Sequence, residues 1–470
     1  MQGSAVSAEI QLHLRVRSTT DFTMRTSVHG AWAALNALLA AALLLPGVTH
    51  AQGRRPPQSF QNMGGLHGLD GMRPDASLLR QNNGQDNERI PDVAALRQAR
   101  GKQAHELIRL HEDVIEADPH GDPILKRQIL VVSPSKEDLA KFLASGFTVA
   151  GTHTLRDLDL QLTTLVVPAA SFTGDALLRL REISPNVIMD FDHLYTMSEA
   201  EDAPGRASTP VASRTGAGNV RLGLIDGGVD ASHAVFRKAK IVHWGCQEKR
   251  IPSEHGTAVG SLMVGEADQF KGVAPGGTLF AADVYCGLST GGSASEIALA
   301  LAWLAKNEVP VINISLVGPS NRILEQAVLA MIRRGHVLTA AVGNDGPAAP
   351  PLYPASYPGV IGVSAVDDRR RVLPEAARGP QVAFIAPGSK MLAASPGAPD
   401  FRVVRGTSFA APIVAALLAE RISKPGAERA ASAVQDLAKQ AIGGNGSRSS
   451  DKGWGLVGEA YRISPDQMQP

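Results

Sequence analysis

The chain has 470 residues, which corresponds to about two or three folded units of ordinary size. Its 46 basic residues nearly balance its 45 acidic residues, and this argues against a nucleic-acid-binding protein, because such a protein needs a basic surface against the phosphates. The apolar fraction of 44% indicates a globular protein and excludes a multi-pass membrane protein, while two cysteines exclude a disulfide-rich scaffold and a four-thiolate zinc site.

Residues 1–51 are predicted to be an export signal. Residues 31–48 form a mostly apolar stretch that follows Arg25 and is followed by a small-x-small site ending at Ala51. This pattern is typical of a Sec signal peptide cleaved after Ala51, and Met24 fits the start of such a signal. An uncleaved membrane anchor is the alternative. Both interpretations predict that the body of the protein leaves the cytoplasm and is secreted or periplasmic.

Residues 52–127 are expected to form a leader and one helix. Up to about residue 90 the chain is rich in Gly, Asn, Gln, Arg and Pro without regular apolar spacing, which is typical of a flexible segment. From residue 93 to residue 117 apolar residues recur at about helical spacing. This pattern predicts a mostly solvated helix that ends before Asp118-Pro119.

Residues 128–196 are predicted to form a small α+β domain. Its strands and helices follow one another in the order βαββαβ, which is the ferredoxin-like arrangement. The strands are expected at 128–132, 147–155, 158–167 and 187–191, and the helices at 135–146 and 174–183. Residues 197–218 are small, polar and interrupted by Pro and Gly, which indicates a linker to a second domain.

Residues 219–462 are predicted to form a larger α/β domain, followed by a short tail at 463–470. Continuous Val, Ile and Leu runs alternate with helical patterns, which indicates a parallel sheet with helices on both faces. In such sheets a functional site lies beyond the carboxyl ends of the strands. The strands are expected at 220–225, 241–244, 279–285, 309–314, 336–342, 360–365 and 382–385, and the helices at 254–264, 293–306, 320–333, 407–422 and 427–441.

Three residues of different chemistry stand at the starts or ends of these elements. Asp226 ends the strand RLGLID, His255 opens the helix HGTAVGSLMVG, and Ser408 begins GTSFAAPIVAALLAE. A serine hydroxyl becomes a nucleophile when an imidazole removes its proton, and a carboxylate can orient that imidazole. Considered singly, Asp226 is a turn residue, His255 a packing or capping residue and Ser408 a helix cap. The order Asp, His, Ser is one of the known chain orders of a catalytic triad.

The segments around these residues resemble the subtilisin-like serine protease family. The matching segments are IDGGVD, HGTAVGSLMVGE, VINISL, AVGNDG, YPASYPGVIGVSAVD, GTSFAAP and DKGWGLVGEA. They follow one another in order between about Asn219 and Tyr461, which is far more specific than one motif. The resemblance implies a subtilisin-like fold for residues 219–462 and a serine endopeptidase that works through an acyl-enzyme.

The resemblance also implies a role for each candidate residue. Ser408 would attack the scissile carbonyl, His255 would act as base and then as acid, and Asp226 would orient the imidazole. Asn344 in AVGNDG matches the family's side-chain oxyanion donor, although a turn at Asn-Asp-Gly is the simpler explanation of that residue alone. Independently, the apolar segment after Ser408 predicts a buried helix whose positive end faces the reaction centre.

Two segments match the edges between which the family holds an extended peptide. Glycines there let a substrate backbone approach closely, and pairing by strand addition reads the main chain. The segments are Thr290-Gly291-Gly292 and Ser315-Leu316-Val317-Gly318. Ordinary glycine-rich loops are the alternative. Val317 stands where the family usually has glycine, and we hypothesise that its branched side chain narrows the pocket for the residue before the scissile bond.

Other hydrolase classes lack their motifs in this chain. No G-x-S-x-G surrounds Ser408, which disfavours an α/β-hydrolase, and no H-E-x-x-H supports zinc catalysis. No metal site and no cofactor for catalysis are therefore expected, while structural calcium stays open. Two other functions also stay open on the same fold: a catalytically silent binding or chaperone module, and an esterase or peptide ligase that uses the same triad.

The two cysteines form either one disulfide or two buried thiols. Cys246 follows a strand upstream of His255, and Cys286 ends the strand before the edge at Thr290. A bridge between them would close a loop of about 40 residues and would stabilise the fold by about 3–4 kcal/mol in an oxidising compartment.

The small domain at 128–196 resembles the prodomain of the same family, which assists folding and inhibits the new enzyme. Its tail, DFDHLYTM, would then lie in the active site, with self-cleavage near Tyr195 to Ser198. A permanent accessory domain is the alternative. The expected partners are protein or peptide substrates and the chain's own prodomain, with no nucleic acid, and the enzyme is expected to be a monomer.

Overall fold

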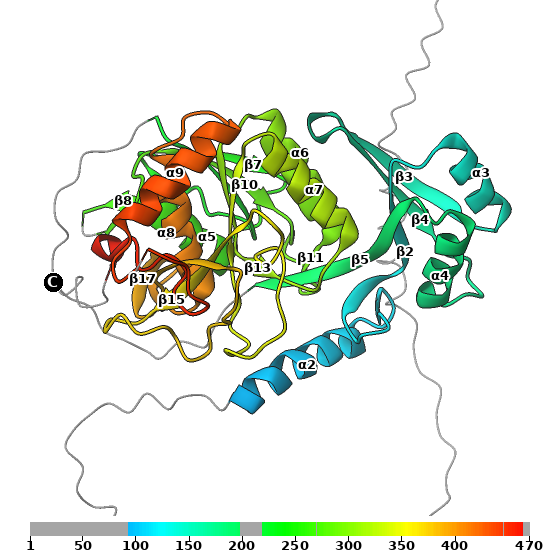
Figure 1. Cartoon of the computed structure of the whole chain (residues 1–470), viewed down its shortest axis with the longest axis horizontal. Helices are drawn as coiled ribbons and strands as arrows, with labels where there is room; N and C mark the ends of the chain where they lie inside the picture. Colours follow the sequence, from blue (N-terminus) through cyan, green and yellow to red (C-terminus); the bar gives the residue numbers. More distant parts are fainter. Residues whose placement is uncertain (1–92, 198–218, 269, 445, 464–470) are drawn as a thin grey trace, which may run out of the picture. The chain divides into compact units, whose positions relative to one another are not determined.

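The computed structural model describes residues 93–197, 219–268, 270–444 and 446–463 (Figure 1). All of them belong to one of the two units of the chain, Asp86–Pro470. The predicted signal peptide, the leader up to residue 92 and most of the predicted linker lie outside the described residues. Among the helices of the described ranges, none is long and apolar enough to cross a membrane.

A parallel sheet forms the centre of residues 219–463. Within the described chain it has seven strands in the order β16-β15-β14-β12-β6-β10-β7, and every neighbouring pair is parallel. The strands consist mostly of buried Val, Ile, Leu and Ala, as expected for a sheet covered on both faces. Their bounds are β6 Arg221–Asp226, β7 Lys240–Trp244, β10 Thr278–Asp283, β12 Val311–Ile314, β14 Val337–Ala341, β15 Ile361–Val366 and β16 Val382–Pro387.

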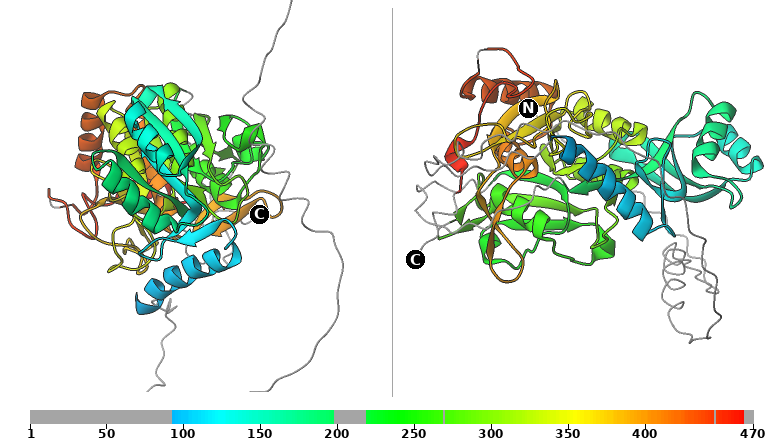
Figure 2. Two further views of the ribbon diagram at one scale, coloured as in Figure 1. Left: turned by 90° about the vertical axis from the view of Figure 1, so that its right-hand side faces the viewer. Right: turned by 90° about the horizontal axis from the view of Figure 1, so that it is seen from below.

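Helices cover both faces of this sheet, so the predicted fold class is confirmed for this part of the chain (Figure 1, Figure 2). One hydrophobic cluster joins the sheet to α5, α8 and α9, and a second joins the opposite face to α6 and α7. α8 is apolar on every side and buried along its whole length. The bounds are α5 Glu254–Val264, α6 Ala294–Lys306, α7 Arg322–Arg333, α8 Thr407–Ala419 and α9 Ala427–Gln440.

The direction in which the chain adds strands to the sheet changes at β6. β6 is the first strand of this sheet in the chain, and it lies between β10 and β12, so later strands extend the sheet on both of its sides. Connections that leave in opposite directions open a crevice at the carboxyl ends of such strands. Asp226, the last residue of β6, therefore stands where α/β proteins usually place a functional site.

Short strands of two to four residues complete the described chain. Strands of this length are too short to show an apolar alternation, so the sequence could not predict them. β8 pairs with β9 and β17 pairs with β18, both antiparallel. The bounds are β8 Glu266–Ala267, β9 Phe270–Lys271, β11 Gly292–Ser293, β13 Leu316–Val317, β17 Met391–Ala394 and β18 Phe401–Val404. Single 3₁₀ turns lie at η1 Arg156–Leu158, η2 Ala234–Phe236, η3 Cys246–Glu248 and η4 Glu459–Tyr461.

Residues 115–197 form an antiparallel sheet with α3 and α4 packed on one face. The chain order is β2-α3-β3-β4-α4-β5, and the order in the sheet is β5-β2-β4-β3, with β1 beside β2. The opposite face, through Leu130 and Leu162, joins the hydrophobic cluster around α6 and α7. The bounds are β1 Ile115–Ala117, β2 Pro123–Val132, α3 Lys136–Ala144, β3 Thr148–Leu155, β4 Leu160–Val166, α4 Thr173–Ile183 and β5 Ile188–Met197.

The structure corrects the prediction of one helix over residues 93–117. Helix α2 spans Val93–Leu110, and the residues from Ile115 onward form strand β1, which pairs with β2. Ile115 is buried in this strand. Its apolar side chain fell at a helical spacing from the residues of α2, and the spacing alone could not distinguish a longer helix from a helix followed by a short strand.

Two strands of the N-terminal domain are also longer than predicted. β2 begins at Pro123 rather than at residue 128, and β5 continues to Met197 rather than ending at residue 191. Each extension lies where the strand has an additional partner: β1 pairs with the start of β2, and β11 and β13 pair with the end of β5. The polar residues of these extensions hid the strands from a prediction based on apolar runs.

Cys246 and Cys286 are joined by a disulfide, and their Cα atoms are 5.1 Å apart. Cys246 follows β7 and Cys286 follows β10, and these two strands are neighbours in the sheet. The carboxyl ends of neighbouring parallel strands lie at the same edge, which brings the two turns together. The bond thus connects the segment that leads to α5 with the segment that leads to β11.

Replacing both cysteines by serine, Cys246→Ser with Cys286→Ser, should lower the free energy of unfolding by about 3–4 kcal/mol, because the unfolded chain then regains the freedom of the closed loop. Urea titration followed by circular dichroism measures the change. Reducing agent should destabilise the parent chain by a similar amount and leave the double variant unchanged. Equal unfolding midpoints for the oxidised parent and the variant would contradict the prediction.

Candidate active site

The carboxylate and the imidazole singled out in the sequence meet in the structure. His255 Nδ1 lies 2.8 Å and 2.9 Å from the two carboxylate oxygens of Asp226. Both side chains are buried, so water and salt screen the pair only weakly. Because an ionised carboxylate can only accept, Nδ1 is the donor, and Nε2 is then the nitrogen of a neutral ring that can accept a proton.

The position of His255 depends on how α5 begins. The hydroxyl of Ser253 accepts a hydrogen bond from Gly256 N at 2.9 Å, and Ser253 N donates to Gly228 O at 2.8 Å. The start of the helix is thus attached to the turn that follows Asp226. A side chain at Gly256 would collide with the carbonyl of Gly227, so this close approach requires glycine.

Ser408 lies in the first turn of α8 and is buried. Gly406, at the N-cap, has φ +137°, a conformation that residues with side chains rarely adopt. The ring of Phe409 lies 5.2 Å from the ring of His255, and α8 packs against α5. Ser408 therefore lies at the positive end of a buried helix, and the residue that follows it, Phe409, contacts the imidazole.

Two polar side chains contact the backbone of the first turn of α8. Asn344 Oδ1 accepts a hydrogen bond from Thr407 N at 3.1 Å, and Ser315 Oγ donates to Ser408 O at 3.0 Å. Since the oxygen of Asn344 accepts this bond, the nitrogen is the end of its amide that can donate. The structure thus brings the candidate oxyanion donor and one residue of a candidate substrate edge to the same helix turn.

A partly buried ion pair holds the turn that enters α8. Arg405 Nε lies 2.6 Å from Glu375 Oε1, and Arg405 Nη2 lies 3.1 Å from Glu375 Oε2. Arg405 Nη1 also donates to Ser389 Oγ at 2.8 Å. A bidentate pair of this kind fixes the orientation of the arginine as well as its position. The backbone that leads to Ser408 is therefore held rigidly, although no motif in the sequence marks this pair.

A second buried carboxylate lies beside Asp226. Asp283 ends β10 and lies in register with Asp226. Burial raises the pKa of Asp283, and the charge of Asp226 adds to this rise. The N–H groups of Cys286 and Tyr285, which donate to its carboxylate, oppose the rise. Within the described ranges, one group of three possible metal ligands lies close together, Cys246, Asp283 and Cys286. Both sulfurs are in the disulfide, which leaves Asp283 alone, fewer ligands than a metal site needs.

Strand β5 lies between the two candidate substrate edges and pairs with both of them in the antiparallel sense. Gly291, which precedes β11, has φ +95° and approaches the Tyr195 carbonyl so closely that a side chain would collide with it. Thr290 lies in the turn before these residues. The paired residues are Gly292 with Tyr195, Ser293 with Leu194, Val317 with Thr196 and Leu316 with Met197.

Tyr195 is fully buried where β5 meets the second edge. Its hydroxyl donates to the carbonyl of Pro319 at 2.8 Å. Its ring covers Gly318 so closely that a Cβ at Gly318 would collide with the ring. Burial raises the pKa of Tyr195, and Tyr357 adds to the rise, so the phenol stays protonated and can donate. No sequence pattern indicates Pro319, because it acts through its backbone oxygen.

Two aspartates of β5 accept hydrogen bonds from the first turns of two helices. Asp190 Oδ2 accepts from Arg322 N of α7 at 2.8 Å, and Asp192 accepts from Ser295 N of α6 at 3.0 Å and from its hydroxyl at 2.6 Å. Burial raises the pKa of Asp192 to about 6, against the hydrogen bonds from Ser295. The sequence analysis did not identify Asp190 and Asp192 as functional residues. Two charged residues within the otherwise apolar segment VIMDFD are the pattern that indicates them.

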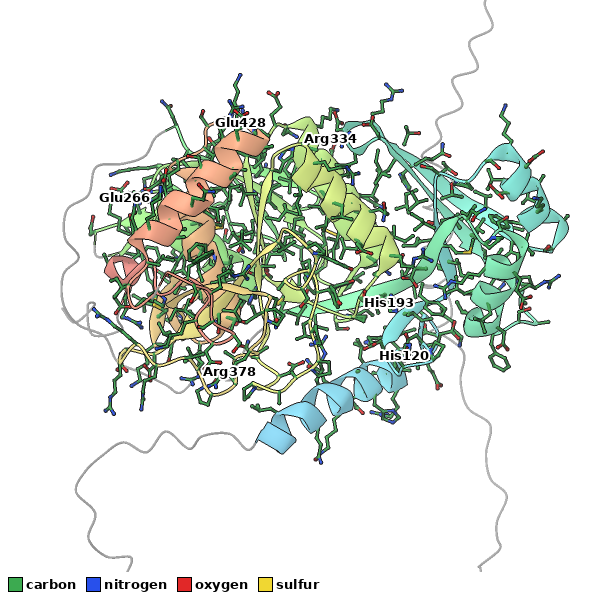
Figure 3. All side chains as sticks on the ribbon, viewed as in Figure 1. His120, His193, Glu266, Arg334, Arg378 and Glu428 are labelled. Carbon is green, nitrogen blue, oxygen red and sulfur yellow. A yellow bond between two sulfur atoms is a disulfide. The ribbon has the colours of Figure 1, made fainter. Side chains whose placement is uncertain are left out.

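Asn321 connects the same strand to the start of α7. Its Nδ2 donates to Phe191 O at 2.9 Å and lies 2.9 Å from Nδ1 of His193, which Figure 3 labels. Its Oδ1 accepts from the N–H groups of Ile323 and Leu324 and so caps the helix. One buried amide therefore serves both the helix and β5, which makes this contact sensitive to any change in register.

Comparison with known proteins identifies the larger domain. A family model described as "Subtilase family" matches residues 217–455, just over half of the chain. The chain is 33% identical over 216 residues to subtilisin E of Bacillus subtilis, and the alignment covers 44% of this chain and 56% of that protein. Its match to a subtilisin of Bacillus pumilus is also 33% identical over 216 residues and covers 78% of that protein.

The structure is similar to that of fervidolysin from Fervidobacterium pennivorans, described as a keratinolytic enzyme related to subtilisin. The identity is 19% and the TM-score 0.58, over 72% of this chain and 61% of that one, so the likeness concerns the fold alone. The family model, the curated relatives and the parallel sheet with its site at the end of β6 agree. This chain belongs to the subtilase family.

Proposed function

We propose that the protein is a serine endopeptidase, made as a zymogen and exported from the cytoplasm, that hydrolyses peptide bonds through an acyl-enzyme. The observation that carries the proposal is the buried hydrogen bond between His255 Nδ1 and Asp226. Ser408 lies in the first turn of α8, and the residue after it, Phe409, packs on the imidazole. These are the three groups that acyl transfer needs: a nucleophile, a base and a group that orients the base.

In the proposed mechanism His255 Nε2 takes the proton of Ser408 Oγ as the oxygen attacks the scissile carbonyl. Asp226 stabilises the imidazolium that forms, because its carboxylate accepts from Nδ1 in a buried environment. The imidazolium then gives its proton to the leaving amine, and the acyl group stays on Ser408. Water, deprotonated by the same nitrogen, attacks the acyl-enzyme and releases the second product. No cofactor takes part in these steps.

The negative charge that develops on the carbonyl oxygen needs donors close to Ser408. The N-terminal end of α8 carries partial positive charge, and Asn344 contacts this helix turn through its oxygen, so its amide nitrogen is the second proposed donor. The ion pair of Arg405 with Glu375 keeps the helix start in place. A donor that is already positioned needs no reorganisation when the charge appears.

We propose that the domain ending in β5 is a ferredoxin-like prodomain that occupies the substrate cleft as an intramolecular inhibitor. In support, β5 pairs by its backbone with both candidate edges, as an extended substrate would. In the antiparallel pairing Thr196 lies opposite Val317, and the next residue of β5, Met197, lies opposite Leu316. The next residue of the edge is Ser315, which contacts the backbone of Ser408. The residue that follows Met197 is Ser198, and we propose self-cleavage directly after it, within the range from Tyr195 to Ser198.

The register supports one way to reconcile two of the sequence hypotheses. If Val317 narrows the pocket for the residue before the scissile bond, a tyrosine there would fit poorly. Tyr195 instead lies opposite Gly292 and over Gly318, which is farther along the edge. We therefore place the bond to be cleaved after Ser198, whose small side chain suits a narrowed pocket, and assign to Tyr195 a separate pocket bounded by Gly318 and the Pro319 carbonyl.

The change Ser408→Ala should abolish both self-processing and casein hydrolysis, because no other group then forms the acyl-enzyme. The purified parent chain should appear as two fragments on a denaturing gel, with the new N-terminus just after Ser198 by mass spectrometry, while the variant stays intact. A serine-directed fluorophosphonate should label the parent and not the variant.

Each alternative has its own outcome in that experiment. A binding or chaperone module would give no labelling and no hydrolysis by the parent chain. An esterase or peptide ligase would also be labelled. An esterase would hydrolyse ester substrates in preference to peptides, and a ligase would transfer its acyl group to added amines rather than to water. If the parent and Ser408→Ala chains both remain uncleaved, the zymogen proposal is wrong.

The change Asn344→Ala should lower kcat by about 10²- to 10³-fold with little change in KM, as is typical when one oxyanion donor is removed. The reason is that the donor acts on charge that exists in the transition state and not in the bound substrate. Steady-state kinetics on a chromogenic peptide measures both constants. A raised KM with unchanged kcat would assign Asn344 to substrate binding instead.

Peptides based on residues 193–202 should be cleaved about 10- to 100-fold faster, as kcat/KM, with tyrosine at the position of Tyr195 than with alanine there, because the ring is fully buried. Phenylalanine should fall between them, because it leaves the Pro319 carbonyl without its donor. A peptide with serine in place of Thr196 serves as control and should match the tyrosine parent. Equal rates for tyrosine and alanine would contradict the pocket assignment.

A further inference from the structure

We infer that the two rims of the substrate cleft form a second docking surface, separate from the edge strands, and that its ligand is helix α2 of the same chain. α2 would act as a latch that keeps β5 in the cleft after the chain has been cut. The inference rests on the proposed function of β5 as an inhibitor. In the view from below, α2, drawn in blue, lies in front of the larger domain (Figure 2).

The first contact is an ion pair at the rim that carries Asn344. Arg100 Nη1 of α2 lies 3.2 Å from Asp345 Oδ2, and the side chains of Arg100 and Asp345 are 27% and 19% exposed. Burial raises the pKa of Asp345, and the nearby Arg100 opposes the rise. Asp345, which follows the proposed oxyanion donor Asn344 in the chain, thus forms an ion pair with a residue of α2.

The second contact lies at the opposite rim. His111, the residue after the end of α2, has its Nε2 3.1 Å from Ser289 Oγ, and Ser289 directly precedes the candidate edge at Thr290. Arg100 and His111 are eleven positions apart, which is about 16 Å along a helix. The helix and its terminus therefore reach from the rim of Asn344 to the rim of β11 and cross the cleft that β5 occupies.

Between these two contacts α2 is loosely packed. An open cavity of about 490 Å³ lies under the helix. It is lined by Ala104 and Leu107 of α2, Leu194 and Thr196 of β5, and Ala349 and Pro350 of the loop after Asp345. Because apolar contact in the middle is incomplete, the two polar contacts at the ends carry much of the attachment. Polar contacts of this kind can break without disrupting a core, as a releasable latch requires.

The latch and the strand hold the same domain by different means. β5 binds by backbone pairing with β11 and β13, whereas α2 binds by side chains, and α2 also packs against β1 and β2 of the same domain. Two attachments of one body increase its effective concentration at the cleft, so the second slows escape after the first has opened. Loss of the α2 contacts should therefore speed prodomain release without changing the cleft itself.

The test uses the full chain with Arg100→Ala, His111→Ala and the double substitution. Self-processing is followed on gels, and the delay between chain cleavage and the rise of peptidase activity reports prodomain release. We expect the delay to shorten by about 3-fold for each single change and about 10-fold for the double change. Arg100→Lys, which keeps the charge, should retain most of the delay. Lys102→Ala, at an exposed position of the same helix, is the matched control and should leave it unchanged.

Unchanged delays in both single variants and the double variant would overturn the inference. A parent chain that is neither cut nor active would refute the proposed function instead, and a second readout then decides the latch. Hydrogen exchange of residues 93–110 and 345–350, measured in the Ser408→Ala chain, should increase at both segments in the double variant and not with Lys102→Ala. Exchange equal to that of the parent would again overturn it, while protection of the parallel sheet verifies that the variants are folded.

Discussion

The rest of the site depends on the buried hydrogen bond between His255 Nδ1 and Asp226. It joins the end of the first strand of the parallel sheet to the first turn of α5. The ring of Phe409 packs on the imidazole, which fixes α8, and the first turn of α8 is contacted in turn by Asn344 and Ser315. The elements β6, α5 and α8 are thus connected through one bond, and a displacement of the imidazole would disturb Ser408 and Asn344 together.

Strand β5 relates this site to the rest of the chain. It is at once the edge strand of the N-terminal sheet, beside β2, and the segment between β11 and β13, so one strand belongs to the fold of the small domain and pairs with two edges of the large one. Backbone pairing sets its register, and the buried Tyr195 fixes that register to within one residue, because a shift by one would turn the ring to the opposite face.

The sequence predicted what depends on apolar pattern and on chemistry in chain order. The parallel sheet and the all-apolar α8 follow from continuous Val, Ile, Leu and Ala runs, and Asp226, His255 and Ser408 stand at element ends where such folds place function. Periodicity could not predict β11 and β13, because each has only two residues, and their segments were identified only through the family resemblance. The role of the Pro319 carbonyl could not be predicted, because every residue has a backbone oxygen. The pair of Arg100 and Asp345 joins residues far apart in the chain and has no local signature.

Two helices of the larger domain begin with groups that residues 219–463 do not supply in full. Ser293 and Asn321 cap α6 and α7, yet the N–H groups of Ser295 and Arg322 are satisfied by Asp192 and Asp190 of β5. Part of the information that specifies the larger domain therefore resides in the smaller one. A chain severed between them would keep its shape but would no longer contain, in one covalent piece, every group that completes that shape.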